Sequence, residues 1–117
     1  MDVITKEVRG LVKKELAAAN RRFRMFASAH EGQNVIREEL DEVEMALEPL
    51  KFFVEIRMWN TVKGNKEVAK EELKEMMENA IHLAVEAIQL AAMLEKYERS
   101  QWNGWPGSKE MGYEKEE

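Results

Sequence analysis

Apolar residues recur at helical spacing along most of the chain. From residue 3 to residue 25 they fall three and four positions apart, with lysines between them. This spacing places side chains on one face of an α-helix. The pattern therefore predicts a first helix over residues 3–25, which closes with the basic segment NRRFRMF.

The second predicted helix has a recognisable start. Ser28 opens the sequence S-A-H-E, a capping box with Glu31 as the reciprocal partner. The apolar pattern then continues over residues 29–47. Pro49 lacks the N–H that a helix interior needs, so it predicts a kink or the start of another segment, PLKFFVEIRMW.

A polar segment, NTVKGN, separates this part from the last predicted helix, with Gly64 as the residue expected to end the pattern. The last helix is predicted over residues 67–97. Its first half is charged and its second half is almost entirely apolar. A helix that is apolar on all sides belongs in the middle of a bundle or at a subunit interface.

Together these elements predict an all-α fold, a helical bundle of three to four helices. A chain of 117 residues suits a single domain, expected over residues 1–99. Residues 100–117 contain Gly, Pro and like charges, which favours an irregular or partly disordered tail.

Composition narrows the possible functions. The absence of cysteine excludes disulfides, thiolate metal sites and thiol nucleophiles. A formal net charge of −5 disfavours binding of a nucleic acid polymer. No signal-like or membrane-spanning apolar run occurs, so a cytoplasmic protein without membrane association is expected.

Two predicted helices carry glutamates in unusual places. On the second helix, Glu39 falls inside the apolar stripe, Glu42 lies at its edge and Glu38 is the next residue along. On the last helix, residues 83–94 are apolar except for Glu86 and Gln89, which share one face. A buried carboxylate takes up a proton or finds a cation, and oxygen ligands suit Mg²⁺ or Mn²⁺.

Other partners for these groups remain open at this point. Glu86 could form a hydrogen bond with a tyrosine or Gln89, or pair with Arg22 or Arg24. A di-iron site is disfavoured because no Glu-x-x-His motif occurs. The two histidines are interpreted as structural, His30 as a first-turn residue and His82 as a polar group at the edge of the core.

The segments HEGQNVIREELDEVEMAL and VEAIQLAAM resemble the MazG-like all-α nucleoside triphosphate pyrophosphohydrolases, particularly small phage and prophage members. The resemblance covers residues 26–97. The family signature is E-E-x-x-E on one helix and E-x-x-D on a later one. Glu38, Glu39 and Glu42 complete the first motif, whereas the second has Glu86 followed by Gln89 in place of the usual Asp.

The resemblance implies an oligomeric bundle that hydrolyses a nucleoside triphosphate, ribo- or deoxyribo-, to the monophosphate and pyrophosphate with Mg²⁺ as cofactor. It assigns metal binding to Glu39, Glu42 and Glu86, and to Gln89 through a neutral oxygen. Glu38 would orient or deprotonate the attacking water. Three arginines could contact substrate phosphates or simply compensate the helix dipole: Arg21, Arg22 and Arg24.

Gln89 supplies no charge, so Mg²⁺ affinity is expected to be lower than with Asp at that position. This departure motivates a second hypothesis, in which the chain keeps the fold but has weakened or lost catalysis. It would then act as a helical homo-oligomer with an interaction or structural role.

Overall fold

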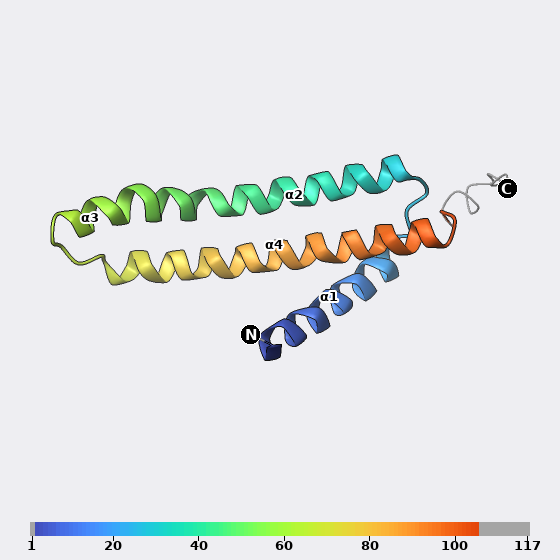
Figure 1. Ribbon diagram of the computed structural model, residues 1–117, viewed down its shortest axis with the longest axis horizontal. Helices are drawn as coiled ribbons and strands as arrows, with labels where there is room; N and C mark the ends of the chain where they lie inside the picture. Colours follow the sequence, from blue (N-terminus) through green and yellow to red (C-terminus); the bar gives the residue numbers. More distant parts are fainter. Residues whose placement is uncertain (1, 106–117) are drawn as a thin grey trace. The chain divides into compact units, whose positions relative to one another are not determined.

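The computed structural model describes residues 2–105, and this part of the chain is helical without a β-strand (Figure 1). The long helices are α1 (Asp2–Arg22), α2 (Ala29–Phe52) and α4 (Lys70–Trp102). A π-helical segment, η1 (Phe53–Met58), and the short α3 (Trp59–Lys63) follow α2. The predicted all-α class is confirmed.

The chain divides into two compact units. Among the described residues, unit 1 comprises 2–40 and 88–105, and unit 2 comprises 41–87. Both α2 and α4 contribute residues to each unit. The single domain expected over residues 1–99 stays a prediction.

Unit 1 has a small core built around the connection between α1 and α2. Leu16, Phe26 and Ala92 are almost fully buried there. The N–H of Phe26 donates a hydrogen bond of 3.1 Å to Oγ of Ser100, and Ser100 is itself fully buried. This bond ties the connection to the end of α4, because a buried N–H without a partner would be costly.

The start of α2 is capped, although not fully as predicted. The N–H of Glu31 donates to Oγ of Ser28 at 3.1 Å, which confirms one half of the capping box. The Glu31 carboxylate accepts a hydrogen bond from the N–H of Ala27 at 3.3 Å. It also pairs with Arg24 at 3.3 Å, so Glu31 fastens the preceding connection to the helix.

Unit 2 is an antiparallel helical hairpin in which the second half of α2, η1 and α3 run against the first half of α4 (Figure 1). Pro49 lies inside α2 and does not interrupt the helix. The helix instead changes its hydrogen-bonding pattern at Phe53, where η1 begins. An ion pair between Arg57 and Glu72 joins η1 to α4.

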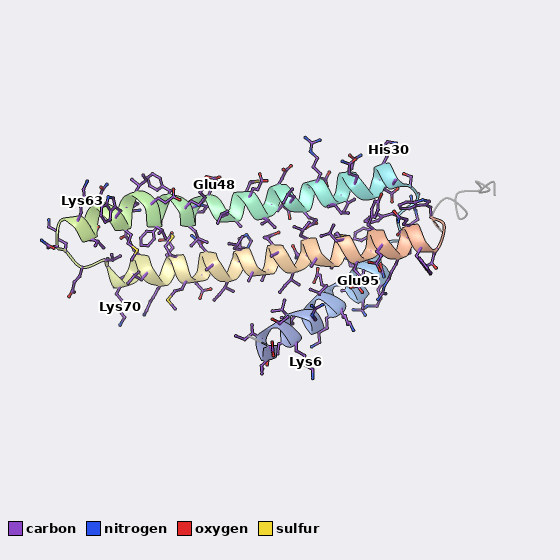
Figure 2. The ribbon with its side chains drawn as sticks, viewed as in Figure 1. Lys6, His30, Glu48, Lys63, Lys70 and Glu95 are labelled. Atoms are coloured by element: carbon purple, nitrogen blue, oxygen red, sulfur yellow. The ribbon has the colours of Figure 1, made fainter. Side chains whose placement is uncertain are left out.

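The turn of the hairpin is located where the sequence predicts it, but a different residue makes it. Asn65 has a left-handed φ of 57°, whereas Gly64 has an ordinary φ of −86°. The N–H groups of Asn65 and Lys66 donate to the carbonyls of Val62 and Thr61, which is the Schellman arrangement. Figure 2 labels Lys63 and Lys70, which lie on the two sides of this turn.

The end of α4 lies beyond its predicted limit. The helix continues to Trp102, three residues into the segment expected to be irregular. A second Schellman arrangement follows, with Gly104 at a φ of 68°. Trp105 then packs edge-on against Tyr97, with ring centroids 5.2 Å apart. The rest of the predicted tail, residues 106–117, lies outside the described residues.

The apolar half of α4 is only partly covered. Ala92 is buried, but Val85 and Leu94 are exposed. Within residues 2–105, no helix combines the length and the apolar character needed to cross a membrane.

Candidate functional site

Two carboxylates meet in unit 2, one from each arm of the hairpin. Glu42 projects from α2 and is exposed, whereas Glu86 projects from α4 with about 13% of its side chain exposed. A hydrogen bond with Glu86, and then repulsion from its charge, raise the pKa of Glu42. His82 opposes this shift. Two carboxylates in this position can share a proton or bind a cation.

Within unit 2, the described contacts of Glu86 are with Glu42 and His82. His82 Nε2 lies 3.6 Å from Glu86 Oε1, one helical turn away. The other oxygen, Oε2, is buried and receives no hydrogen bond from an N–H group of the described chain. This oxygen therefore has ligand capacity that the residues around it do not use.

Glu42 and Glu86 open into a cavity of about 290 Å³ within unit 2. Asn79 and His82 add polar groups to its lining, and Ala46 and Pro49 add apolar ones. His82, predicted as a polar group at the edge of the core, is exposed and lines this cavity. His30 is exposed on the first turn of α2, as expected (Figure 2).

The other two predicted metal ligands belong to unit 1. Glu39 and Gln89 are both half-buried, and both line a cavity of about 600 Å³ in that unit. Each is three residues from a partner in the same helix, Glu39 from Glu42 on α2 and Gln89 from Glu86 on α4. Such pairs project from one side of a helix.

Glu38, the predicted catalytic residue, is exposed on α2 and lines neither of these cavities. This placement leaves its side chain accessible to water. Its role stays a prediction.

The three predicted phosphate-binding arginines separate into two groups. Arg22 and Arg24 line the unit 1 cavity, whereas Arg21 is an exposed residue in the last turn of α1 and does not. The guanidinium of Arg22 lies 5.7 Å from the centroid of the Phe23 ring. Arg24 pairs with Glu31 and donates to the carbonyl of Met25.

Sequence reasoning missed a buried lysine in the same cavity. Lys96 is only 3% exposed, and its Nζ lies 4.9 Å from the centroid of the Phe26 ring. Burial lowers its pKa, Glu31 opposes the change and Arg24 adds to it. The available signal was its position four residues after Ala92 and three after Met93, on the inward side of α4.

Comparison with protein-family models, curated proteins and solved structures finds no match to this chain.

Proposed function

We propose that the protein is a Mg²⁺-dependent nucleoside triphosphate pyrophosphohydrolase, which cleaves an NTP or dNTP to the monophosphate and pyrophosphate. The observation that carries the proposal is the meeting of Glu42 and Glu86, carboxylates from two helices, with His82 beside Glu86. Such a pair is stabilised by a divalent cation, because the cation removes the repulsion between the two charges.

Helical spacing extends this pair to the complete proposed ligand set. Glu39 lies one turn before Glu42, and Gln89 lies one turn after Glu86. All four side chains offer oxygen atoms, the ligands that Mg²⁺ prefers. Gln89 contributes no charge, so the set holds a cation less tightly than one with Asp at this position.

In this proposal, bound Mg²⁺ supplies positive charge to the phosphates and lowers the pKa of a coordinated water. Glu38, exposed beside Glu39 on α2, orients the attacking water or accepts its proton. Arg22 and Arg24, which line the unit 1 cavity, are the proposed phosphate contacts. A cytoplasmic location, a phage or prophage origin and a homo-oligomeric state belong to the same proposal.

The test is pyrophosphate release from a panel of NTPs and dNTPs in the presence of Mg²⁺ or Mn²⁺. Release that stops on addition of a chelator is the expected result. Glu39→Ala should abolish it while the helical content, measured by circular dichroism, stays unchanged. A folded protein that releases no pyrophosphate from any nucleotide would contradict the proposal.

An exposed apolar stripe favours a second candidate function, that of a non-catalytic helical oligomer. Four residues at four-residue spacing share one face of α4 in unit 2, and all four are exposed: Leu73, Met77, Ile81 and Val85. Apolar surface of this kind is often covered by another protein chain.

Thermal melting with added metal separates the two functions. A ligand that binds the folded state raises the melting temperature. The enzyme should show this rise with Mg²⁺ or Mn²⁺, and the non-catalytic oligomer should not. For the oligomer, Ile81→Lys is expected to lower the molar mass measured by light scattering, whereas an unchanged mass would exclude this stripe as the interface.

A further inference from the structure

Lys96 is a buried cation that forms no ion pair with a carboxylate of residues 2–105. The residue is only 3% exposed, and its Nζ lies over the ring of Phe26. The ion pairs of the described residues do not include Lys96, and the nearby carboxylate of Glu31, which acts on Lys96 through its charge, is paired with Arg24. A buried ammonium group is costly without an anion, so this position favours a ligand that brings one.

The cavity around Lys96 has the size and lining of a small-molecule site. Its volume of about 600 Å³ lies within the range of typical ligand cavities. Residues from α1, α2 and α4 contribute apolar side chains, among them Ala18, Val35 and Met93. The site can therefore take an apolar ligand body as well as a charged group.

Phe23 provides a surface for a planar ligand. It lines the cavity, and its side chain is 63% exposed, so the ring is accessible from solvent. The guanidinium of Arg22 lies over this ring and can remain beside a stacked ligand. Aromatic side chains bind nucleobases by stacking without requiring a particular base.

We propose that the unit 1 cavity binds a nucleoside phosphate, with the phosphate against Lys96 and the base against Phe23. The inference rests on the proposed function for the identity of the ligand, and it deepens that function by naming the groups that bind each part of the nucleotide. It concerns binding and requires no metal. Its test can therefore be separated from the test of hydrolysis.

The experiment measures binding by calorimetry in EDTA, with AMP and adenosine as probes. The full chain should bind AMP more tightly than adenosine, because only AMP brings an anion to Lys96. Lys96→Met is expected to weaken AMP binding about tenfold to a hundredfold, the range for a charge-assisted hydrogen bond, and to leave adenosine binding unchanged. Methionine retains an unbranched apolar chain, so burial of this side chain is preserved.

Phe23→Ala tests the other half of the site. It should weaken the binding of AMP and adenosine alike, by about tenfold, the order expected for loss of one stacked base. Because Phe23 is exposed, the variant is expected to fold. Lys74→Met, at an exposed position of α4 in unit 2, is the matched control and should leave both affinities unchanged.

Equal affinities for AMP and adenosine, absence of AMP binding, or AMP binding that survives Lys96→Met would each overturn the inference. Hydrolysis gives a separate answer. Pyrophosphate release together with one of these results would leave the proposed function standing. Binding as expected without any hydrolysis would contradict the proposed function and support the site.

Discussion

Gly32 of α2 lies so close to Tyr97 of α4 that a β-carbon on Gly32 would be 2.6 Å from Cδ2 of the tyrosine ring. The ring has little room to move, because Trp105 packs against it. Phe26 would also be only 3.0 Å from the new atom. The absence of a side chain at this position therefore allows the start of α2 and the end of α4 to pack together.

Gly32→Ala is expected to lower the free energy of unfolding by about 1–3 kcal/mol, since overpacking outweighs the better helix propensity of alanine. Gly10→Ala is the matched control, because nothing lies within 4 Å of the added atom there. It should raise stability by about 0.5–1 kcal/mol. Urea denaturation measures both, and changes of the same sign would contradict the close packing at Gly32.

Ser100→Ala should cost about 1–3 kcal/mol, because the buried N–H of Phe26 would lose its acceptor. Denaturant unfolding provides the measurement. Gln101→Ala, at the exposed neighbouring position, should change stability by less than about 0.5 kcal/mol. Equal effects of the two substitutions would show that the hydrogen bond contributes little.

The hairpin turn gives a prediction about backbone conformation. Asn65→Ala should destabilise the protein by about 1 kcal/mol, since alanine is disfavoured at a φ of 57°. Asn65→Gly should be tolerated. Gly64→Ala should be nearly neutral, because φ is negative there and the nearest atoms are 3.5 Å away. Thermal melting of the three variants checks this order, and a larger loss at Gly64 than at Asn65 would contradict it.

The pairing of Glu42 with Glu86 makes stability depend on pH. The raised pKa of Glu42 means that its protonated form is favoured in the folded state. Its stabilising contribution is therefore present below the ordinary pKa of about 4.5 and is lost as pH rises through the raised pKa. In metal-free buffer, Glu42→Gln should melt at a higher temperature than the natural protein near pH 7.

This advantage of Glu42→Gln should disappear in acid, where the natural residue carries a proton. Glu44→Gln, at an exposed position of the same helix, controls for a general change in net charge. Equal pH dependence of the two variants in melting experiments between pH 4 and 7 would count against the carboxylate pair.

Gln89→Asp is expected to strengthen Mg²⁺ binding, because it adds a negative charge to the proposed ligand set. Calorimetric titration with Mg²⁺ measures the change. Glu38→Gln removes a charge from a nearby position outside the proposed ligand set, and it tests whether Mg²⁺ affinity responds to any nearby charge. An unchanged affinity in Gln89→Asp would exclude position 89 from contact with the cation.

The sequence predicted the helices well, because their apolar spacing and the capping residue Ser28 are local signals. It located the hairpin turn but assigned it to Gly64, since glycine is the usual residue at a positive φ and Asn65 adopts one less often. The change to π-helical geometry at Phe53 carries no comparable local signal.

Predicting the candidate site from sequence was harder, because it depends on contacts between distant segments. The unusual position of Glu86 among apolar residues was visible in the sequence, and its grouping with Glu42 was expected from the resemblance, but the contact itself depends on how the two arms of the hairpin pack. Lys96 was missed because it stands among charged residues in EKYER, which is typical of an exposed face. Its burial follows from the connection that brings Phe26 and Glu31 to α4.

The π-helical segment Phe53–Met58 affects how the tip of the hairpin presents its side chains. A π-turn holds about one residue more than an α-helical turn, so the side chains beyond it are rotated by about 100° about the axis. Trp59 and Val62, both exposed on α3, therefore point in directions that an uninterrupted α2 would not give them. Deleting one residue from this segment would reverse that rotation for all side chains of α3. The direction in which α3 presents its side chains therefore depends on the number of residues in the segment rather than on their identity.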